Sequence, residues 1–303
     1  MKGLKVGHYS HKEHRTGVSV FLFDQPARGA YVLCGAAPAS HELATLEPDA
    51  SVSVLHGLVL LGGSAFGLFA AEGVMRFLKE AGVGLALPHG GVIPIVPAAG
   101  VYDLAYGMPV PPSADDAYKA CEMAHEDNIE SGAIGAGTGA TVGKIIPNAY
   151  HMTSGIGRAE ITLSSGLTVI AYAVVNAVGD IRNAAGDIIA GATDDAGHFV
   201  NCAEFLVSGQ GEALLINQRA NTTLVSVFTN AAFTKSELKR VAKMGVAGMA
   251  RAISPVFTDY DGDIVFAISM GDKQASVLSV GALAADVIQR AIMDAVRTTD
   301  VIR

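Results

Sequence analysis

The C-terminal third of the chain alternates strand and helix patterns, and this alternation limits the fold more than any other feature of the sequence. Thr222–Phe228 and Ile264–Met270 are short β-branched and apolar runs, which predict buried strands. Each run is followed by a helical period, at Thr234–Ile253 and at Ser276–Val296. The first of these opens with Thr-x-x-Glu, the spacing of a capping box, which marks a helix start. The pattern predicts an α/β (α+β) fold with helices on both sides of a sheet.

Similar patterns occupy much of the remaining chain. Strands are predicted at Thr16–Asp24, Ala30–Cys34, Ser53–Leu61, Arg158–Leu163 and Leu167–Asn176, and helices at Ala65–Ala81 and Ser113–Asp127. The first two strands are separated by Pro26, Arg28 and Gly29 and are expected to pair around a turn. The last two are expected to form a hairpin. Ser113 is the expected N-cap of its helix, because two aspartates follow in the first turn.

Two longer passages lack a clear period. Gly82–Pro112 is rich in glycine and proline but too apolar for a solvated linker, which favours an ordered loop beside a site. Gly179–Gln218 has mixed polarity and is expected to be extended and partly helical. No internal repeat, low-complexity tract or sharp change of composition divides the chain. We therefore predict a single domain over residues 1–303.

The balance of charged and apolar residues limits the possible partners. Half of the 303 residues are apolar, so the chain can bury a large core and its stability requires no cofactor or metal. The 21 basic residues are scattered and the net charge is -8, which argues against a nucleic-acid groove. No apolar run is long enough to predict a membrane span. The three cysteines form no CxxC pair, which favours a reducing cytoplasm.

A glycine-rich run, Gly135–Lys144, has some features of a phosphate-binding loop. A Walker loop requires glycine six residues before its lysine and Ser or Thr after it, and this chain has Thr138 and Ile145 at those positions. Nucleotide binding is therefore disfavoured. The glycines either turn the backbone tightly or allow Lys144 to approach a reacting centre closely.

Other familiar catalytic and metal-binding patterns are weak or absent. His8, His11 and His14 would share one face only on a helix, and the residues around them predict a polar surface turn instead. The sequence has no HExxH or CxxC pattern, so no metal site is predicted. Ser64 directly follows a glycine, which does not match a nucleophile elbow and favours the N-cap of the next helix.

Asn221 and Thr222 stand at the start of a predicted strand, where the threonine hydroxyl could attack the preceding carbonyl. The attack would shift the acyl group from nitrogen to oxygen and release Thr222 with a free α-amine. That amine has an ordinary pKa of about 7.7 to 8.0, so it can act as a general base near neutral pH. Threonine is also common in strands that have no such role.

Asp261 and Asp263 precede another predicted strand and are separated by Gly262. In an extended backbone their carboxylates would point the same way and could together hold an ammonium, a hydroxyl or a shared proton. An ordinary Asp-Gly turn is the alternative.

Taken together and in their order along the chain, the motifs resemble those of one family. This family is the self-processing DmpA-type aminopeptidases and β-peptidyl aminopeptidases, which include the NylC-type 6-aminohexanoate-oligomer hydrolases. The resemblance covers nearly the whole chain. The matching segments are Gly3–His8, Arg15–Gly17, Leu61–Gly67, Ile93–Ala99, Tyr102–Asp103, Gly137–Lys144, Ala173–Asn176, Asn221–Thr223 and Asp261–Asp263.

The resemblance implies a four-layer αββα sandwich, similar to that of N-terminal-nucleophile hydrolases but with different connectivity. It also implies self-cleavage between Asn221 and Thr222. The products would be an α subunit of residues 1–221 and a β subunit of residues 222–303, which stay associated. A homo-oligomer, a tetramer of such αβ units, is expected on the same ground.

The same resemblance assigns roles to the candidate residues. Thr222 is the nucleophile, and the charge of Lys144 favours its reactive amine and the developing oxyanion. Asn176 donates its side-chain amide to the oxyanion, although an asparagine at a strand end can also be purely structural. Asp261 and Asp263 orient the nucleophile and its amine.

Within the family, the Asn-Thr junction and the paired aspartates resemble the NylC type. The DmpA type differs, because the resemblance gives it a Gly-Ser junction and a serine and a glutamate downstream in place of the paired aspartates. The resemblance implies an endo-acting hydrolase of linear ω-amino or β-amino amides, such as 6-aminohexanoate oligomers, with Tyr102 lining the pocket and bonding the substrate. The alternatives are an exo-acting aminopeptidase, D-amidase, esterase or β-peptidyl aminopeptidase, and an uncut binding protein without catalysis. A small amide or short oligomer is the expected partner of the enzyme.

Overall fold

The computed structural model describes residues 1–126, 128–146, 149–210 and 221–302. The α-helices are α1 (Ser64–Gly67), α2 (Ala71–Glu80), α3 (Ala114–Glu122), α4 (Cys202–Val207), α5 (Lys235–Ala252) and α6 (Val277–Asp294). The main sheets contain β1 (Leu4–His11), β2 (Thr16–Leu33), β3 (Ala39–His41), β4 (Leu55–Leu61), β7 (Ala98–Gly100), β10 (Ile156–Thr162), β11 (Thr168–Asn176), β14 (Thr222–Ala231) and β16 (Ile264–Lys273). Small additional sheets contain β5 (Leu85–Ala86), β6 (Val92–Ile93), β8 (Thr141–Val142), β9 (His151–Thr153), β12 (Asp180–Arg182), β13 (Ile188–Ala190), β15 (Ile253–Ser254) and β17 (Val301–Ile302).

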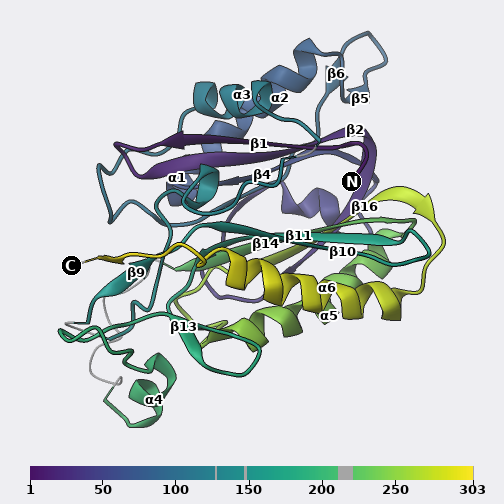
Figure 1. Cartoon of the computed structure of the whole chain (residues 1–303). Helices are drawn as coiled ribbons and strands as arrows, with labels where there is room; N and C mark the ends of the chain where they lie inside the picture. Colours follow the sequence, from purple (N-terminus) through teal and green to yellow (C-terminus); the bar gives the residue numbers. More distant parts are fainter. Residues whose placement is uncertain (127, 147–148, 211–220, 303) are drawn as a thin grey trace.

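The helices and main sheets stack in four layers (Figure 1). The first sheet contains β1, β4, β7, β3 and the first half of β2, and α2 and α3 cover its outer face. The second sheet contains β10, β11, β14, β16 and the second half of β2, and it is covered by α5 and α6. This arrangement confirms the αββα sandwich that the sequence resemblance implied.

Strand β2 belongs to both sheets and corrects one prediction. The sequence predicts two paired strands at Thr16–Asp24 and Ala30–Cys34, but the structure has one long strand whose halves do not pair with each other. Its first half pairs with β1 and β4, and its second half pairs with β16. The register against β4 shifts between Leu22 and Ala27. Pro26, which lacks an N–H, lies in this exposed irregular stretch, where it breaks no ladder hydrogen bond.

Alternating side chains along the central strands build cores on both faces of a sheet. In β14, Leu224 and Phe228 belong to the core between the two sheets, whereas Val225 and Val227 pack with the core of α5 and α6. Burial of both faces explains why apolar residues point to both sides of this strand. Each such side chain contributes about 1.5 to 3 kcal/mol on burial, so the ends of these strands are rigidly placed.

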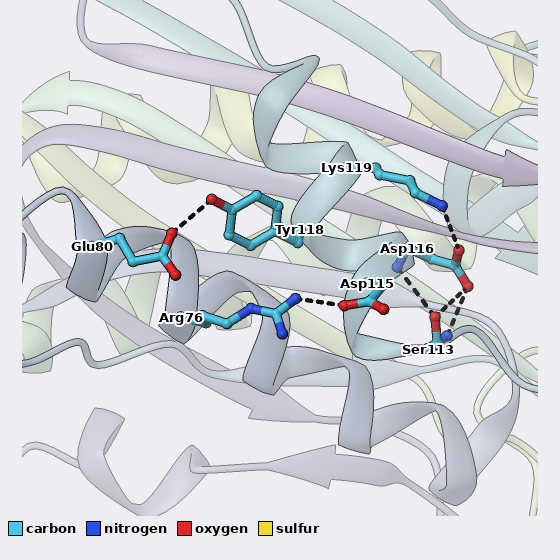
Figure 2. Close-up of polar contacts among 7 residues, drawn as sticks. All are labelled: Arg76, Glu80, Ser113, Asp115, Asp116, Tyr118 and Lys119. Carbon is cyan, nitrogen blue, oxygen red and sulfur yellow. Dashed lines mark hydrogen bonds and ion pairs between the residues drawn. The ribbon is translucent and has the colours of Figure 1, made fainter.

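Polar contacts join α2 and α3 on the outer surface, as Figure 2 shows. Arg76 lies 2.6 Å from the carboxylate of Asp115, and Tyr118 donates a hydrogen bond of 2.7 Å to Glu80. The guanidinium of Arg76 also lies over the Tyr118 ring, 4.9 Å from its centroid. Exposed ion pairs contribute only about 0 to 1 kcal/mol, so these contacts orient the two helices more than they stabilise the fold.

Two predicted helix starts agree with the structure and one is wrong. Ser113 and Thr234 each form a capping box, at the starts of α3 and α5. The helix predicted at Ala65–Ala81 consists of α1, one 3-10 turn and α2. Its N-cap is Gly63 and not Ser64. Gly63 has a φ of 80°, a left-handed conformation that glycine adopts without strain.

The three N-terminal histidines do not share one turn. His11 ends β1 and His14 lies in the turn that follows, where their rings stack. These two residues agree with the predicted polar turn. His8 instead lies buried within β1, so the prediction is wrong for this residue. Its Nδ1 atom lies 2.8 Å from the hydroxyl of Ser19. Burial, and secondarily the neighbouring His125, lowers the pKa of His8 to about 4, which makes it a neutral core residue.

The remaining predicted elements agree in type with the structure. Arg158–Leu163 and Leu167–Asn176 correspond to the hairpin of β10 and β11. Gly82–Pro112 contains the β5–β6 hairpin and β7, and Gly179–Gln218 contains β12, β13 and α4, with residues 211–218 outside the described part. Over the described ranges, none of the helices combines the length and apolarity that a membrane span requires.

Candidate active site

Strand register brings the ends of three strands together at one edge of the second sheet. Asn176, the last residue of β11, pairs directly with Thr222, the first residue of β14. Strand β14 runs parallel to β16, and Asn221 forms a bridge with Asp261 just before β16 begins. The strand order therefore places three candidate segments, distant in sequence, beside one another.

Thr222 is buried and is bonded to the carbonyl group that precedes it. The residue is 4% exposed, and its hydroxyl donates to the carbonyl oxygen of Asn221. The same oxygen accepts a hydrogen bond of 2.9 Å from the main-chain N–H of Gly262. A hydroxyl and an N–H donor thus both contact the carbonyl at the predicted cleavage junction.

Asn176 connects several parts of the site. Its side-chain oxygen accepts from Nζ of Lys144 at 2.8 Å and from the N–H of Thr141 at 3.1 Å. Nζ of Lys144 also donates to the main-chain oxygen of Asn176 at 3.1 Å. The side-chain nitrogen of Asn176 donates to the carbonyl oxygen of Tyr102 at 3.0 Å. The donors on its oxygen, which include Nζ of Lys144 and the N–H of Thr141, determine which way the amide group of Asn176 faces.

Lys144 places a buried amine among carboxylates. The residue is 7% exposed, and its main-chain N–H donates to the carbonyl of Val178 at 2.9 Å, just beyond β11. Burial lowers the pKa of Lys144 to about 7, and the negative charges of three aspartates oppose this shift. These aspartates are Asp261, Asp103 and Asp263. An amine with this pKa can give or take a proton near neutral pH.

Both predicted aspartates are buried, and both accept main-chain hydrogen bonds. Asp263 accepts from the N–H groups of Thr223 at 2.6 Å and Phe257 at 3.3 Å. Asp261 accepts from the N–H of Thr258 at 2.9 Å and from its hydroxyl at 2.6 Å. Burial, reinforced by the charge of Asp261, raises the pKa of Asp263 to about 8, and burial also raises the pKa of Asp261. Asp263 therefore retains its proton over much of the neutral range.

Asp103 belongs to the same cluster, although the sequence interpretation gave it no role. It is 1% exposed, and its Oδ1 atom accepts from the N–H of Gly63 at 2.7 Å. Burial raises the pKa of Asp103, and the charge of Lys144 opposes the shift. A Cβ atom at Gly62 would lie 2.0 Å from Oδ2 of Asp103, so that position must be glycine. The sequence signal that could have indicated a role for Asp103 was its position as a single carboxylate within a long apolar passage.

Two glycines of the site leave no space for a side chain. A Cβ atom at Gly262 would lie 2.7 Å from Oγ1 of Thr222 and 2.7 Å from the carbonyl oxygen of Ala37. A Cβ atom at Gly143 would lie 2.1 Å from the nitrogen of Ala192. Glycine at 143 thus leaves room for the main chain at Ala192, next to Lys144 in sequence, whereas the packing requirement at 262 was missed in the sequence.

Tyr102 contacts the site through its main-chain carbonyl, which accepts from Asn176. The role of its phenol in substrate binding stays a prediction. In the part of the chain that the structure describes, no group of three or more His, Cys, Asp or Glu side chains is arranged to hold a metal ion. Cys34, Cys121 and Cys202 are free cysteines.

Comparison with known proteins identifies the family. The sequence profile of peptidase family S58 matches residues 1–303. The chain belongs to peptidase family S58. An uncharacterized aminopeptidase of Mycobacterium leprae is 34% identical to this S58 peptidase, over 98% of the chain and 88% of its own length. A 6-aminohexanoate-oligomer endohydrolase of Kocuria sp. is 28% identical, over 97% of the chain and 84% of its own length.

Solved structures show that the fold is shared. A β-aminopeptidase of Burkholderia sp. has a TM-score of 0.71 and 18% identity, and the L-aminopeptidase D-Ala-esterase/amidase of Ochrobactrum anthropi has a TM-score of 0.72 and 16% identity. Each match covers 97% of this chain and 84% of the other. The latter is described as a variant of the N-terminal-nucleophile hydrolase fold. Membership of peptidase family S58, together with the sequence relatives, makes the protein a hydrolase of the peptidase or amidase type, as predicted.

Proposed function

We propose that this S58 peptidase cleaves itself between Asn221 and Thr222 and then hydrolyses amides with Thr222 as its nucleophile. The observation that carries the proposal is the hydrogen bond from the Thr222 hydroxyl to the carbonyl oxygen of Asn221. A hydroxyl already in contact with the preceding carbonyl needs little movement to attack it. The buried cluster of Lys144 and three aspartates supplies groups that exchange protons near neutral pH.

Self-cleavage takes place in two steps, an acyl shift from nitrogen to oxygen and the hydrolysis of the resulting ester. Oγ1 of Thr222 adds to the carbonyl carbon of Asn221 while its proton passes to a base, and the C–N bond then breaks as the nitrogen takes up a proton. The product is an ester between the two residues. Water then hydrolyses the ester to the carboxylate of Asn221 and the hydroxyl of Thr222, whose amine was already freed when the C–N bond broke.

The mature enzyme repeats this chemistry on a substrate amide. The free amine of Thr222 accepts the hydroxyl proton, the substrate amine leaves with a proton, and water hydrolyses the resulting acyl-enzyme. Asn176 donates its side-chain amide to the tetrahedral oxyanion, and Lys144 lies beside it with a stabilising charge. Asp261 and Asp263 orient the nucleophile and its amine.

For the substrate we propose linear ω-amino or β-amino amides cut in the endo mode. The Asn-Thr junction and paired aspartates support this choice, together with the 28% identity to the 6-aminohexanoate-oligomer endohydrolase. The 34% identity to an uncharacterized aminopeptidase favours exo action as the second candidate. An N-blocked ω-amino oligomer separates the two, because only an endo-acting enzyme releases products from a chain without a free amine.

A valine at position 222 tests the nucleophile, because valine matches threonine in shape but has no hydroxyl. The Thr222→Val chain should remain full length and hydrolyse no amide. Thr223→Val is the matched control, since Thr223 is equally buried and its hydroxyl has no hydrogen-bond partner among the described residues. The control should cleave and show a second N-terminus at Thr222 on sequencing. A Thr222→Val chain that still divides would refute the proposal.

A further inference from the structure

The carbonyl group at the junction is held by the main chain of a neighbouring loop. The oxygen of Asn221 accepts a hydrogen bond of 2.9 Å from the N–H of Gly262, and it also accepts from the hydroxyl of Thr222. The donor and the attacking group therefore meet at the same carbonyl before any bond has changed.

The loop that carries this N–H is fixed from its other side. The N–H of Ala37 donates to the carbonyl of Asp261 at 2.9 Å, and the N–H of Cys34 donates to the carbonyl of Asp263 at 2.8 Å. The residue between these two anchors is Gly262, packed against the nucleophile without space for a Cβ atom. A donor held in this way needs no reorganisation when charge develops on its acceptor.

Asn176, the donor proposed for substrate turnover, has a different arrangement in the uncut chain. Its side-chain nitrogen donates to the carbonyl oxygen of Tyr102 at 3.0 Å, and its side-chain oxygen is held by Lys144. Neither of these two contacts involves the carbonyl of Asn221.

From these contacts we infer that the main-chain N–H of Gly262 is the oxyanion donor of self-cleavage, and that Asn176 has this role only in substrate turnover. The inference rests on the self-cleavage proposed above. When Oγ1 of Thr222 bonds to the carbonyl carbon of Asn221, the π electron pair moves onto the oxygen that Gly262 already contacts. Cleavage of the C–N bond returns that pair to the carbonyl of the ester. The two reactions of the site then use the same nucleophile with different donors.

An amide-to-ester exchange at position 262 removes the N–H and leaves the residue without a side chain. Glycolic acid can be placed there by nonsense suppression in cell-free translation, and self-cleavage is followed by mass spectrometry over time. Mild alkali, which cuts the ester bond, confirms incorporation. Loss of one oxyanion donor should slow cleavage about 100-fold or more.

The matched control is lactic acid in place of Ala37. The ester at 262 also weakens the carbonyl of Asp261 as an acceptor for the N–H of Ala37, and the control removes that same 2.9 Å bond directly. Cleavage of the control should slow less than about tenfold, because the bond it loses does not involve the reacting carbonyl. Resistance to trypsin, compared with that of the Thr222→Val chain, shows whether each ester chain has folded.

Asn176→Ala provides a second test that does not depend on the ester chains. Lys144 keeps its bond to the main-chain oxygen of Asn176 in this variant. Self-cleavage should continue, slowed less than about tenfold, while substrate turnover falls about 100-fold or more. Loss of self-cleavage in this variant would assign the oxyanion to Asn176 and overturn the inference.

The ester chains give two further contradicting results. Cleavage of the 262 ester at the wild-type rate, or equal slowing of the 262 and 37 esters, would show that the Gly262 N–H does not stabilise the oxyanion. The wild-type chain, translated in parallel, must itself divide after Asn221. A wild-type chain that stays intact would overturn the proposed function together with this inference, whereas an intact 262 ester beside a divided wild type and control supports it.

Discussion

Nζ of Lys144 lies 2.8 Å from the side-chain oxygen of Asn176. Because the oxygen of this amide faces the lysine and the N–H of Thr141, its nitrogen faces the opposite way, where it acts as a donor. The lysine thus orients the group that the proposed mechanism requires at the substrate oxyanion.

Asn176→Asp tests this orientation. An aspartate keeps an oxygen toward Lys144 but presents a second oxygen where the amide nitrogen was, so it repels the oxyanion instead of donating to it. We expect kcat to fall about 100- to 1000-fold with little change of KM. Steady-state kinetics on a short amide check the result, and a variant that changes only KM would place Asn176 in substrate binding.

Lys144→Met tests the buried charge. The methionine fills a similar volume but cannot donate to the side-chain and main-chain oxygens of Asn176, and it removes the amine whose charge acts on the nearby aspartates. A buried acceptor left without its donor costs about 1 to 3 kcal/mol. We expect the chain to stay uncut and to unfold at lower urea concentration than the uncut Thr222→Val chain. Equal unfolding midpoints of the two chains would mean that the buried lysine makes no net contribution to stability.

The raised pKa of Asp263 should make the stability of the fold depend on pH. Its pKa is raised to about 8 by burial and by Asp261, against about 3.9 in an unfolded chain. A carboxyl with a raised pKa favours the folded state most below pH 4, and this contribution is lost as the pH rises toward 8. Stability should therefore fall between pH 5 and pH 7, by about 1 kcal/mol per pH unit.

The uncut Thr222→Val chain with and without Asp263→Asn shows whether this residue is the source. Urea unfolding at pH 5, 6 and 7 should show a smaller loss of stability in the double variant, because asparagine does not titrate. Identical slopes in the two chains would assign the pH dependence to other groups.

Replacement of Lys235 should lower the stability of the fold without preventing self-cleavage. Its buried Nζ donates to the carbonyls of Thr45, Glu47, Ala50 and Val52. Lys235→Met leaves these carbonyls without that donor, at about 1 to 3 kcal/mol for each one that stays unsatisfied. We expect a clearly lower melting temperature with self-cleavage intact, measured by calorimetry and gel electrophoresis. An uncut Lys235→Met chain that melts normally would contradict this separation.

Local signals in the sequence predicted many of the elements but not how they join. The N-cap at Ser113 and the capping box at Thr234 lie where the sequence placed them, because a cap depends only on residues a few positions apart. The continuity of β2 through Pro26 was not predictable, since it depends on pairing with β1, β4 and β16, whose positions are set by the whole sandwich.

The candidate site shows the same limit. Thr222 and the pair Asp261 and Asp263 were found from their chemistry, and their proximity to Lys144 and Asn176 came only from the family resemblance. For Gly262 the sequence left both an extended residue and a turn open, because the lack of space beside the nucleophile exists only in the folded chain.

The intact mass of the purified protein under denaturing conditions shows whether the chain divides after Asn221. We expect two polypeptides whose masses correspond to residues 1–221 and 222–303, with Thr222 at the start of the second. A single species with the mass of residues 1–303, in a preparation that hydrolyses amides, would contradict this expectation.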